Sequence, residues 1–221
     1  MILEEKISIP AAQARAAQKI YRMDKPMYLS FDEWAPHPHG GGLLTTLAVA
    51  QFLNAFIRHA DMVKMANYTL LTSILGFDPT HGKHFKTPFF YVFKMFANGC
   101  RGKSLDTFVR CDTFDVDNFY KGIPYLDVSA VYAEDNHSLI LNVVNRHEHD
   151  AITTDIVSDS GDFTSEASVQ EVYSEDPKEP YTYARKDDYI PKTKTISTDK
   201  SKMTYSFPPH SFTQIIVGMN E

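Results

Sequence analysis

Residues 27–34, MYLSFDEW, decide the first half of the fold, because an apolar run ends there in two acidic residues. The run MYLSF is short and continuous, which is typical of a strand buried in a parallel sheet. Pro36, Pro38 and the triplet Gly40–Gly42 predict a loop directly behind it. Residues 43–58 carry apolar side chains at steps of three or four and predict a helix. A second apolar run, residues 62–66, predicts another strand.

Two further helices are predicted around this strand–helix–strand unit. Residues 11–22 are rich in Ala and Gln and predict a helix, with Pro10 in its first turn. Residues 68–75 predict a helix that ends at Gly76. The order helix, strand, helix, strand, helix indicates an α/β arrangement with a parallel sheet over residues 1–85.

The rest of the chain, residues 86–221, has a different pattern of apolar and turn-forming residues. Turn-forming clusters such as 134–137 and 159–162 separate short runs of β-forming residues, which predicts an antiparallel β-sandwich. The predicted strands are residues 89–93, 126–132, 139–144, 152–157, 169–173, 203–207 and 212–217. Ser174 to Lys202 is rich in charge, Pro and Thr and predicts a long exposed connection. The expected fold class is therefore α/β followed by all-β.

Composition excludes several classes of protein. The 221 residues are 43% hydrophobic and 23% charged, which is ordinary for a globular chain. The formal net charge is −6 with no basic block, so nucleic acid is not an expected partner. No apolar run reaches the roughly 20 residues of a membrane helix, and the acidic N-terminus does not resemble a secretory signal. Two cysteines make no disulfide framework, and we expect a cytoplasmic protein.

The pair Asp32-Glu33 is the best candidate for chemistry. Ligand sites of α/β sheets gather at the carboxyl ends of strands, where Glu33 and the lone tryptophan Trp34 are predicted to lie. A carboxylate next to an indole suits sugar chemistry. Side chains alternate along a strand, so Asp32 and Glu33 are not expected to act as a catalytic pair. From spacing alone, a solvated acid and a packed tryptophan are the commoner interpretation.

A family resemblance favours the chemical interpretation. The segments MYLSFDEWAPH, LAVAQFLNAFIRHADMVKMAN, TPFFYVFKMFANGCRG and PYLDVSAVY resemble, in order, the C-terminal part of α-L-arabinofuranosidases of glycoside hydrolase family 51. That family combines a (β/α)₈ barrel with a β-sandwich, so residues 1–85 would be a partial barrel. By resemblance, Glu33 would be the catalytic nucleophile of a retaining mechanism. Trp34 would shape the sugar pocket, and Asn67 would lie at the active-site end of the next strand.

The resemblance also implies that the catalytic machinery is incomplete. Family members carry their general acid/base in an Asn-Glu pair on barrel strand four, and the Asn220-Glu221 pair here lacks that context. Retaining hydrolysis needs two carboxyl groups about 5–5.5 Å apart, and a barrel of this type takes about 250 residues. Residues 35–40 and Lys86 also depart from the family pattern. The chain would then need an upstream barrel half or a homo-oligomer, and would be nearly inactive alone.

The implied substrate is a terminal, non-reducing α-L-arabinofuranosyl residue of an oligosaccharide or polysaccharide. The alternative is a non-catalytic interaction module, or a β-sandwich that contacts carbohydrate. No metal or cofactor is expected: His37, His39 and His59 lack a completing ligand pattern, and Gly40–Gly42 lacks a phosphate-loop spacing. Asp61 and Asn67 each suit either the barrel mouth or a capping role.

Overall fold

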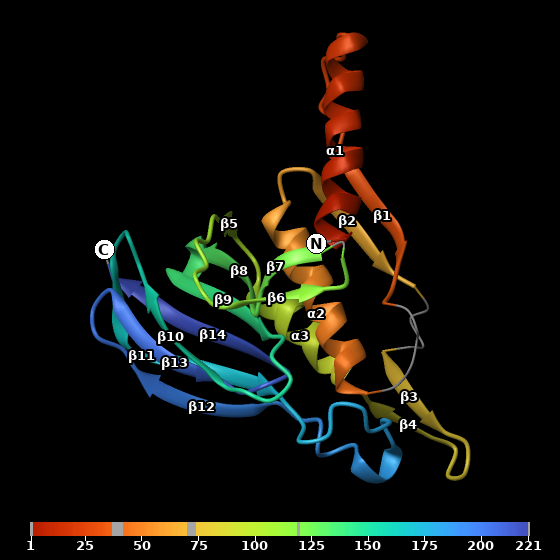
Figure 1. Cartoon of the computed structure of the whole chain (residues 1–221), viewed down its shortest axis with the longest axis vertical. Coiled ribbons are helices and arrows are strands. Elements are labelled where there is room, and N and C mark those ends of the chain that lie inside the picture. Colours follow the sequence, from red (N-terminus) through yellow and green to blue (C-terminus); the bar gives the residue numbers. More distant parts are fainter. Residues whose placement is uncertain (1, 37–41, 70–73, 119, 221) are drawn as a thin grey trace.

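The computed structural model describes residues 2–36, 42–69, 74–118 and 120–220 (Figure 1). The described α-helices are α1 (Ile2–Ile20), α2 (Leu43–Arg58) and α3 (Pro88–Gly99), with short 3₁₀ turns η2 (Glu134–Asn136) and η3 (Tyr183–Arg185). The described strands are β1 (Leu29–Trp34), β2 (Val63–Tyr68), β3 (Leu75–Asp78), β4 (Lys83–Lys86), β5 (Lys103–Leu105), β6 (Thr113–Val116), β7 (Tyr120–Pro124), β8 (Leu126–Ala133), β9 (Ser138–Asn145), β10 (Ile152–Val157), β11 (Asp162–Val172), β12 (Lys192–Ser197), β13 (Lys202–Phe207) and β14 (Ser211–Asn220).

The largest sheet has the strand order β12-β11-β14-β9-β8-β5, and its neighbouring strands are antiparallel. Successive side chains of β14 point to opposite faces, as the pleat requires. Ile215 and Val217 pack on one face, whereas Phe212 packs on the other. Both faces of this sheet are therefore apolar and need a cover.

The antiparallel pair β10–β13 covers the first face. Met203, Tyr205 and Phe207 of β13 are 5% exposed or less and pack in one cluster with residues of β8, β9, β11 and β14. The second half of the chain thus contains the predicted antiparallel strands, with the pair β10–β13 packed on the large sheet.

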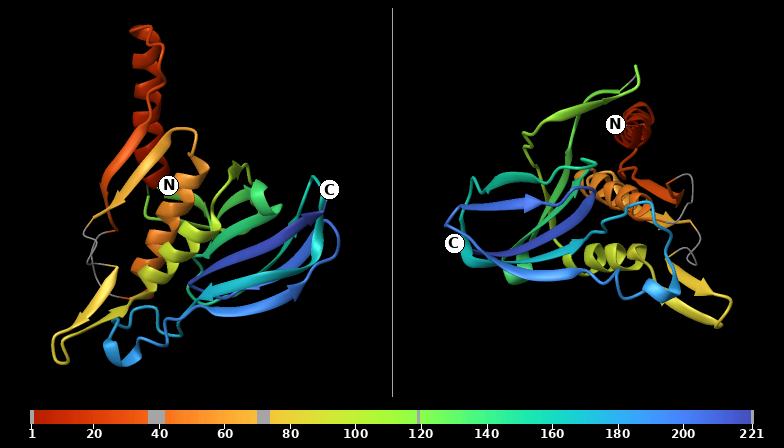
Figure 2. Two further views of the ribbon diagram at one scale, coloured as in Figure 1. Left: turned by 180° about the vertical axis from the view of Figure 1, so that it is seen from behind. Right: turned by 60° about the horizontal axis from the view of Figure 1, so that its bottom comes forward.

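Helices α2 and α3 cover the second face (Figure 2). Leu47 and Ala50 of α2 join Val92 and Phe96 of α3 in a buried cluster. The ring of Phe96 stacks on Phe212 of β14 with centroids 5.2 Å apart. Because α2 belongs to the predicted first part and α3 to the second, the two parts share one core, and the boundary at residue 85 stays a prediction.

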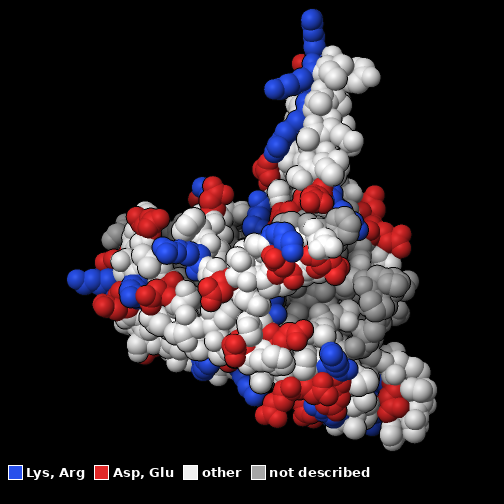
Figure 3. All heavy atoms as spheres, viewed as in Figure 1, with Lys and Arg blue, Asp and Glu red and all other residues white. Residues whose placement is uncertain are grey.

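The parallel pair β1–β2 lies on the other side of α2, which connects the two strands. Phe31 of β1 contacts Phe56 of α2 with ring centroids 5.2 Å apart. Helix α1 docks through Ile7, Ala11 and Ala14, and its far end projects away from the body (Figure 1). Lys and Arg follow one side of this projection, and red and blue groups are interspersed on the rest of the face shown (Figure 3).

The predicted secondary structure is confirmed for α2 and for most strands of the second half. The predicted strand 89–93 is wrong, because Pro88 starts a helix whose buried Phe89, Val92 and Phe96 recur at helical steps. Pro10 lies inside α1, not in its first turn, and burial of residues on both sides holds the helix there.

The predicted helix 68–75 is wrong at both ends, since Tyr68 ends β2 and Leu75 begins β3; residues 70–73 lie outside the described residues. The connection 174–202 contains β12 and η3. Overall, the described residues form a mostly-sheet structure with one large antiparallel sheet. The predicted partial (β/α)₈ barrel is not evident among them, since their parallel strands are β1 and β2, which pair only with each other.

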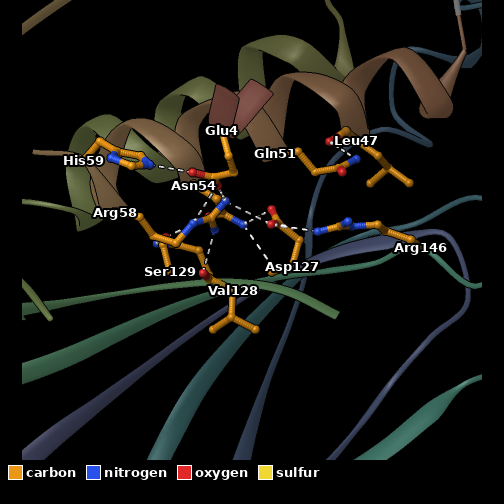
Figure 4. Close-up of polar contacts among 11 residues, drawn as sticks. Glu4, Leu47, Gln51, Asn54, Arg58, His59, Asp127, Val128, Ser129 and Arg146 are labelled. Carbon is orange, nitrogen blue, oxygen red and sulfur yellow. Dashed lines mark hydrogen bonds and ion pairs between the residues drawn. The ribbon is translucent and has the colours of Figure 1, made fainter. Parts of the chain in front are cut away.

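The carboxylate of Asp127 on β8 joins the helices to the sheet (Figure 4). Its Oδ1 lies 3.1 Å from Nη2 of Arg58 and 2.8 Å from Nη2 of Arg146, and its Oδ2 accepts a hydrogen bond from Asn54 at 3.0 Å. The side chain of Asp127 is only 7% exposed. A buried carboxylate needs such partners, because burial without them strongly disfavours the charge.

A chain of buried hydrogen bonds continues from Asn54 across the sheet to α3. Ser129 donates to Oδ1 of Asn54 at 2.8 Å, and Asn142 donates to Ser129 at 3.2 Å. Gln214 donates to Asn142 at 2.8 Å and to the carbonyl of Met95 at 3.2 Å. These hydrogen bonds link α2 to α3 through the strands β8, β9 and β14.

Substitution of Asp127 tests this description. Asp127→Ala leaves two arginines without their shared partner, and we expect a loss of about 3–5 kcal/mol in the free energy of unfolding. Urea denaturation followed by circular dichroism measures it. The matched control is Asp155→Ala, which removes an exposed carboxylate 2.9 Å from Lys202. Equal losses in the two variants would contradict the role given to Asp127.

Helix α1 is tied to α2 through Glu4. Its Oε1 lies 2.5 Å from Nη2 of Arg58, and its Oε2 lies 2.5 Å from Nε2 of His59. Burial acts to raise the pKa of Glu4, but the hydrogen bond and charge of Arg58, together with His59, outweigh it and lower that pKa from its ordinary 4.5.

The lowered pKa of Glu4 predicts a pH-dependent stability. The contribution of Glu4 is complete at a pH above 4.5 and is lost as pH falls through the lower pKa of the folded state. We expect Glu4→Gln to have a lower Tm than the parent chain near neutral pH, with the difference shrinking in acid. Thermal unfolding across this pH range measures it. A constant difference would contradict the assignment.

Candidate functional site

The carboxyl ends of β1 and β2 bring together three of the predicted polar residues. Phe31 lies opposite Ala66 and Trp34 lies opposite Tyr68, so two residues of β1 face the single residue Asn67 of β2. Those two residues are Asp32 and Glu33. This irregularity is a β-bulge, a feature that is frequent next to active sites.

The bulge leaves the polar side chains on the exposed side. Asp32, Glu33 and Asn67 are all exposed, whereas Phe31 and Trp34 pack in the cluster under the strands. Ser30 donates a hydrogen bond to Oδ1 of Asp32 at 2.5 Å. Within the described part of the chain, the Glu33 carboxylate has neither a hydrogen bond nor an ion pair. It is therefore free to meet a ligand.

Trp34, the residue after Glu33, packs on the buried side of the strands. Its indole is 5% exposed and its ring centroid lies 5.1 Å from those of Phe52 and Phe56, and 5.0 Å from that of Tyr68. Its Nε1 is buried and has no acceptor among the described residues. The packing fixes the end of β1, while the predicted contact of Trp34 with sugar stays a prediction.

An unpredicted hairpin, β3–β4, lies beyond the carboxyl ends of β1 and β2 (Figure 1). Strand β3 pairs with β4, and Phe77 lies opposite His84 with ring centroids 5.0 Å apart. Phe77 is 56% exposed. The alternation of apolar and polar residues on both sides of 79–82 is the signal for this hairpin, whereas the predicted helix 68–75 covers only its first residue, Leu75.

The remaining candidates have local partners. His59 contacts Glu4, Asp61 lies 2.5 Å from Arg15 at the amino end of β2, and His81 lies 2.5 Å from Asp78. His37, His39 and Gly40–Gly41 lie outside the described residues. No group of three His, Cys, Asp or Glu side chains suited to a metal occurs in the ranges that the structure describes.

The two cysteines are not paired with each other, and each is partly buried. Burial raises the pKa of the Cys100 thiol to about 11, although a hydrogen bond with Asn142 opposes the shift. A thiol of that pKa is protonated at neutral pH and is a poor nucleophile.

The position of the lone tryptophan can be tested directly by fluorescence. Because the indole of Trp34 is packed among aromatic rings, we expect blue-shifted emission and weak quenching by acrylamide in the native chain. Unfolding in urea should shift the emission to the red and strengthen quenching severalfold, because water then reaches the indole. Native quenching equal to that of the urea-unfolded chain would contradict the packing of Trp34.

The fold is shared with solved structures of glycoside hydrolases. A family 51 alpha-L-arabinofuranosidase from Bifidobacterium longum superposes with a TM-score of 0.82 at 18% identity, covering 97% of this chain and 47% of that one. The arabinose complex of the Thermotoga maritima alpha-L-arabinofuranosidase gives a TM-score of 0.74 at 20% identity, covering 86% of this chain and 42% of that one. These likenesses show the fold.

The family follows from the sequence itself. The model of the alpha-L-arabinofuranosidase C-terminal domain matches residues 32–211, and the chain belongs to this family. The intracellular exo-alpha-(1->5)-L-arabinofuranosidase 1 of Bacillus subtilis is 26% identical over 178 residues, which are 71% of this chain and 35% of the relative. A probable alpha-L-arabinofuranosidase C of Aspergillus terreus is 28% identical over 178 residues, covering 77% and 34%. The chain spans about a third of the length of these relatives.

Proposed function

We propose that this chain forms part of a retaining α-L-arabinofuranosidase that releases terminal, non-reducing α-L-arabinofuranosyl residues. Glu33 is the nucleophile and attacks the anomeric carbon, and Asn67 binds the sugar beside it. The observation that supports this most is the exposed Glu33 carboxylate, placed by a bulge at the carboxyl end of a parallel strand and opposite Asn67.

The general acid/base of this proposal comes from another polypeptide segment. A retaining glycosidase holds its two carboxyl groups about 5–5.5 Å apart. Asp32 is hydrogen-bonded to Ser30, so it is poorly suited to donate a proton to the leaving group. We propose that an upstream barrel half supplies the second carboxyl group, or a second copy of the chain if the enzyme is a homo-oligomer.

The exposed side of the parallel pair supports such a partner. Met65 of β2 is 57% exposed, and Tyr28, the residue before β1, is 52% exposed. Parallel strands of this kind are normally covered on both faces. Within the described residues, β1 and β2 pair only with each other. A partial (β/α)₈ barrel whose remaining strands lie against this face would cover these side chains and complete the site.

The cellular location and the substrate class that we propose are taken from the names of the relatives. Two matched relatives, from Bacillus subtilis and Halalkalibacterium halodurans, are named intracellular arabinofuranosidases, and we propose a cytoplasmic location and an arabinofuranose-containing substrate. None of the described helices combines the length and apolar character of a membrane span.

The proposal is tested with an aryl α-L-arabinofuranoside. The monomeric chain alone should release almost no aryl alcohol, and addition of the upstream half as a separate polypeptide should restore turnover. In the restored complex, Glu33→Gln should lower kcat by at least about 10²-fold, because loss of a reacting group removes most of the acceleration.

The matched control is Asp32→Asn, which changes the neighbouring acid of the same bulge and should retain most of the activity. Equal kcat for the parent and Glu33→Gln complexes would refute the nucleophile assignment. Normal turnover by the chain as a monomer would refute the proposed need for a second carboxyl donor, whereas turnover by a self-associated form would assign that donor to a second copy.

A further inference from the structure

A large cleft lies between helix α2 and the β6–β7 hairpin. Its volume is about 870 Å³, within the roughly 300–1,000 Å³ of small-molecule sites. Leu47 and Gln51 of α2 form one wall, and Phe114 and Tyr120 of the hairpin form the other. Glu33, Trp34 and Asn67 are not among its lining residues.

Contacts within the chain hold the walls of this cleft in place. Phe114 stacks on Tyr125 with ring centroids 4.9 Å apart, and Tyr125 contacts the ring of His147 at 4.4 Å. His210 also lines the cleft, and its Nδ1 and Nε2 lie 2.9 Å and 3.0 Å from the carbonyl oxygens of Glu148 and Ser174. The cleft is therefore largely preformed, which reduces the ordering cost of binding.

Carboxylates outnumber the available cations around the cleft. Arg146 lines it, but its guanidinium is already paired with Asp127 at 2.8 Å. Figure 4 shows this arginine beside Gln51 and Leu47 of α2. The other charged lining residues are Lys178, Asp117, Glu148 and Glu175. Three carboxylates disfavour a polyanion, and so many polar groups disfavour a wholly apolar ligand.

We propose that this cleft binds a neutral oligosaccharide. A sugar ring presents an apolar face that packs on Tyr120 and Phe114. Its hydroxyl groups can donate hydrogen bonds to the carboxylate of Glu148 and to the amide oxygen of Gln51, whose Nε2 already donates to the carbonyl of Leu47 at 3.3 Å. The inference does not rest on the proposed catalysis, since it needs neither Glu33 nor a second polypeptide.

Titration calorimetry of the purified 221-residue chain tests the inference. The probes are arabinotriose and cellotriose as neutral ligands and trigalacturonic acid as the anionic comparator. We expect saturable binding of at least one neutral probe and weaker binding of the anionic one. Tyr120→Ala should weaken the neutral binding by about tenfold, the loss expected for an aromatic contact. Gln51→Ala should weaken it severalfold, because a hydrogen-bonding partner is removed.

The matched control is Tyr21→Ala, which removes a tyrosine that is 76% exposed at the end of α1 and outside the cleft. Its affinity should equal that of the parent chain. If Tyr120→Ala does not fold by circular dichroism, Gln51→Ala decides.

Three results would overturn the inference. They are no saturable binding of either neutral probe, tighter binding of trigalacturonic acid, and neutral binding that Glu33→Ala abolishes while Gln51→Ala leaves it unchanged. The last result would place the sugar at the carboxyl ends of β1 and β2. Loss of arabinofuranosidase turnover in Glu33→Gln, by contrast, has no bearing on this cleft.

Discussion

The buried carboxylate of Asp127 is the interaction on which the arrangement of helices and sheet depends. It is the shared partner of Arg58 on α2 and Arg146 at the end of β9. Because Arg58 also binds Glu4, the same network reaches α1. A single charged group thus fixes the position of two helices relative to an antiparallel sheet, and the parallel pair β1–β2 is positioned in turn by α2.

That positioning gives the candidate site its geometry. The packing of Phe31 and Trp34 on α2 leaves the polar residues of the bulge no place except the exposed side of the strands. Helix α2 therefore has two roles: one side contributes to the core with the large sheet, and the other side supports the strand that carries Glu33. The membership of the chain in the arabinofuranosidase C-terminal family agrees with this shared use of α2, since the family match extends from residue 32 to residue 211.

Elements with regularly spaced apolar residues are predicted well from the sequence. Elements whose secondary structure is decided by tertiary packing are predicted less well. Helix α2 and strand β10 have the predicted bounds, because their periods are unambiguous. The aromatic run at Phe89 has high β propensity, and only its burial on the sheet selects the helix. Strand β12 is hidden by its lysines and threonines, which are typical of an edge strand. The exposure of Glu33 can be predicted, because this residue follows an apolar run. The bulge cannot, because it depends on the register between β1 and β2, which the sequence of one strand does not determine.

The order of strands in the large sheet has a consequence for how the chain acquires its structure. Strand β14 is the last described strand, yet it lies between β11 and β9 and hydrogen-bonds to both. Until it is in place, β12-β11 and β9-β8-β5 are separate pieces with unpaired edges. Non-local pairing of this kind slows folding and leaves exposed edges open to association with other chains. The sheet that lacks β14 is thus the folding stage most open to aggregation. Loss of β14 would disrupt this sheet more than loss of an edge strand.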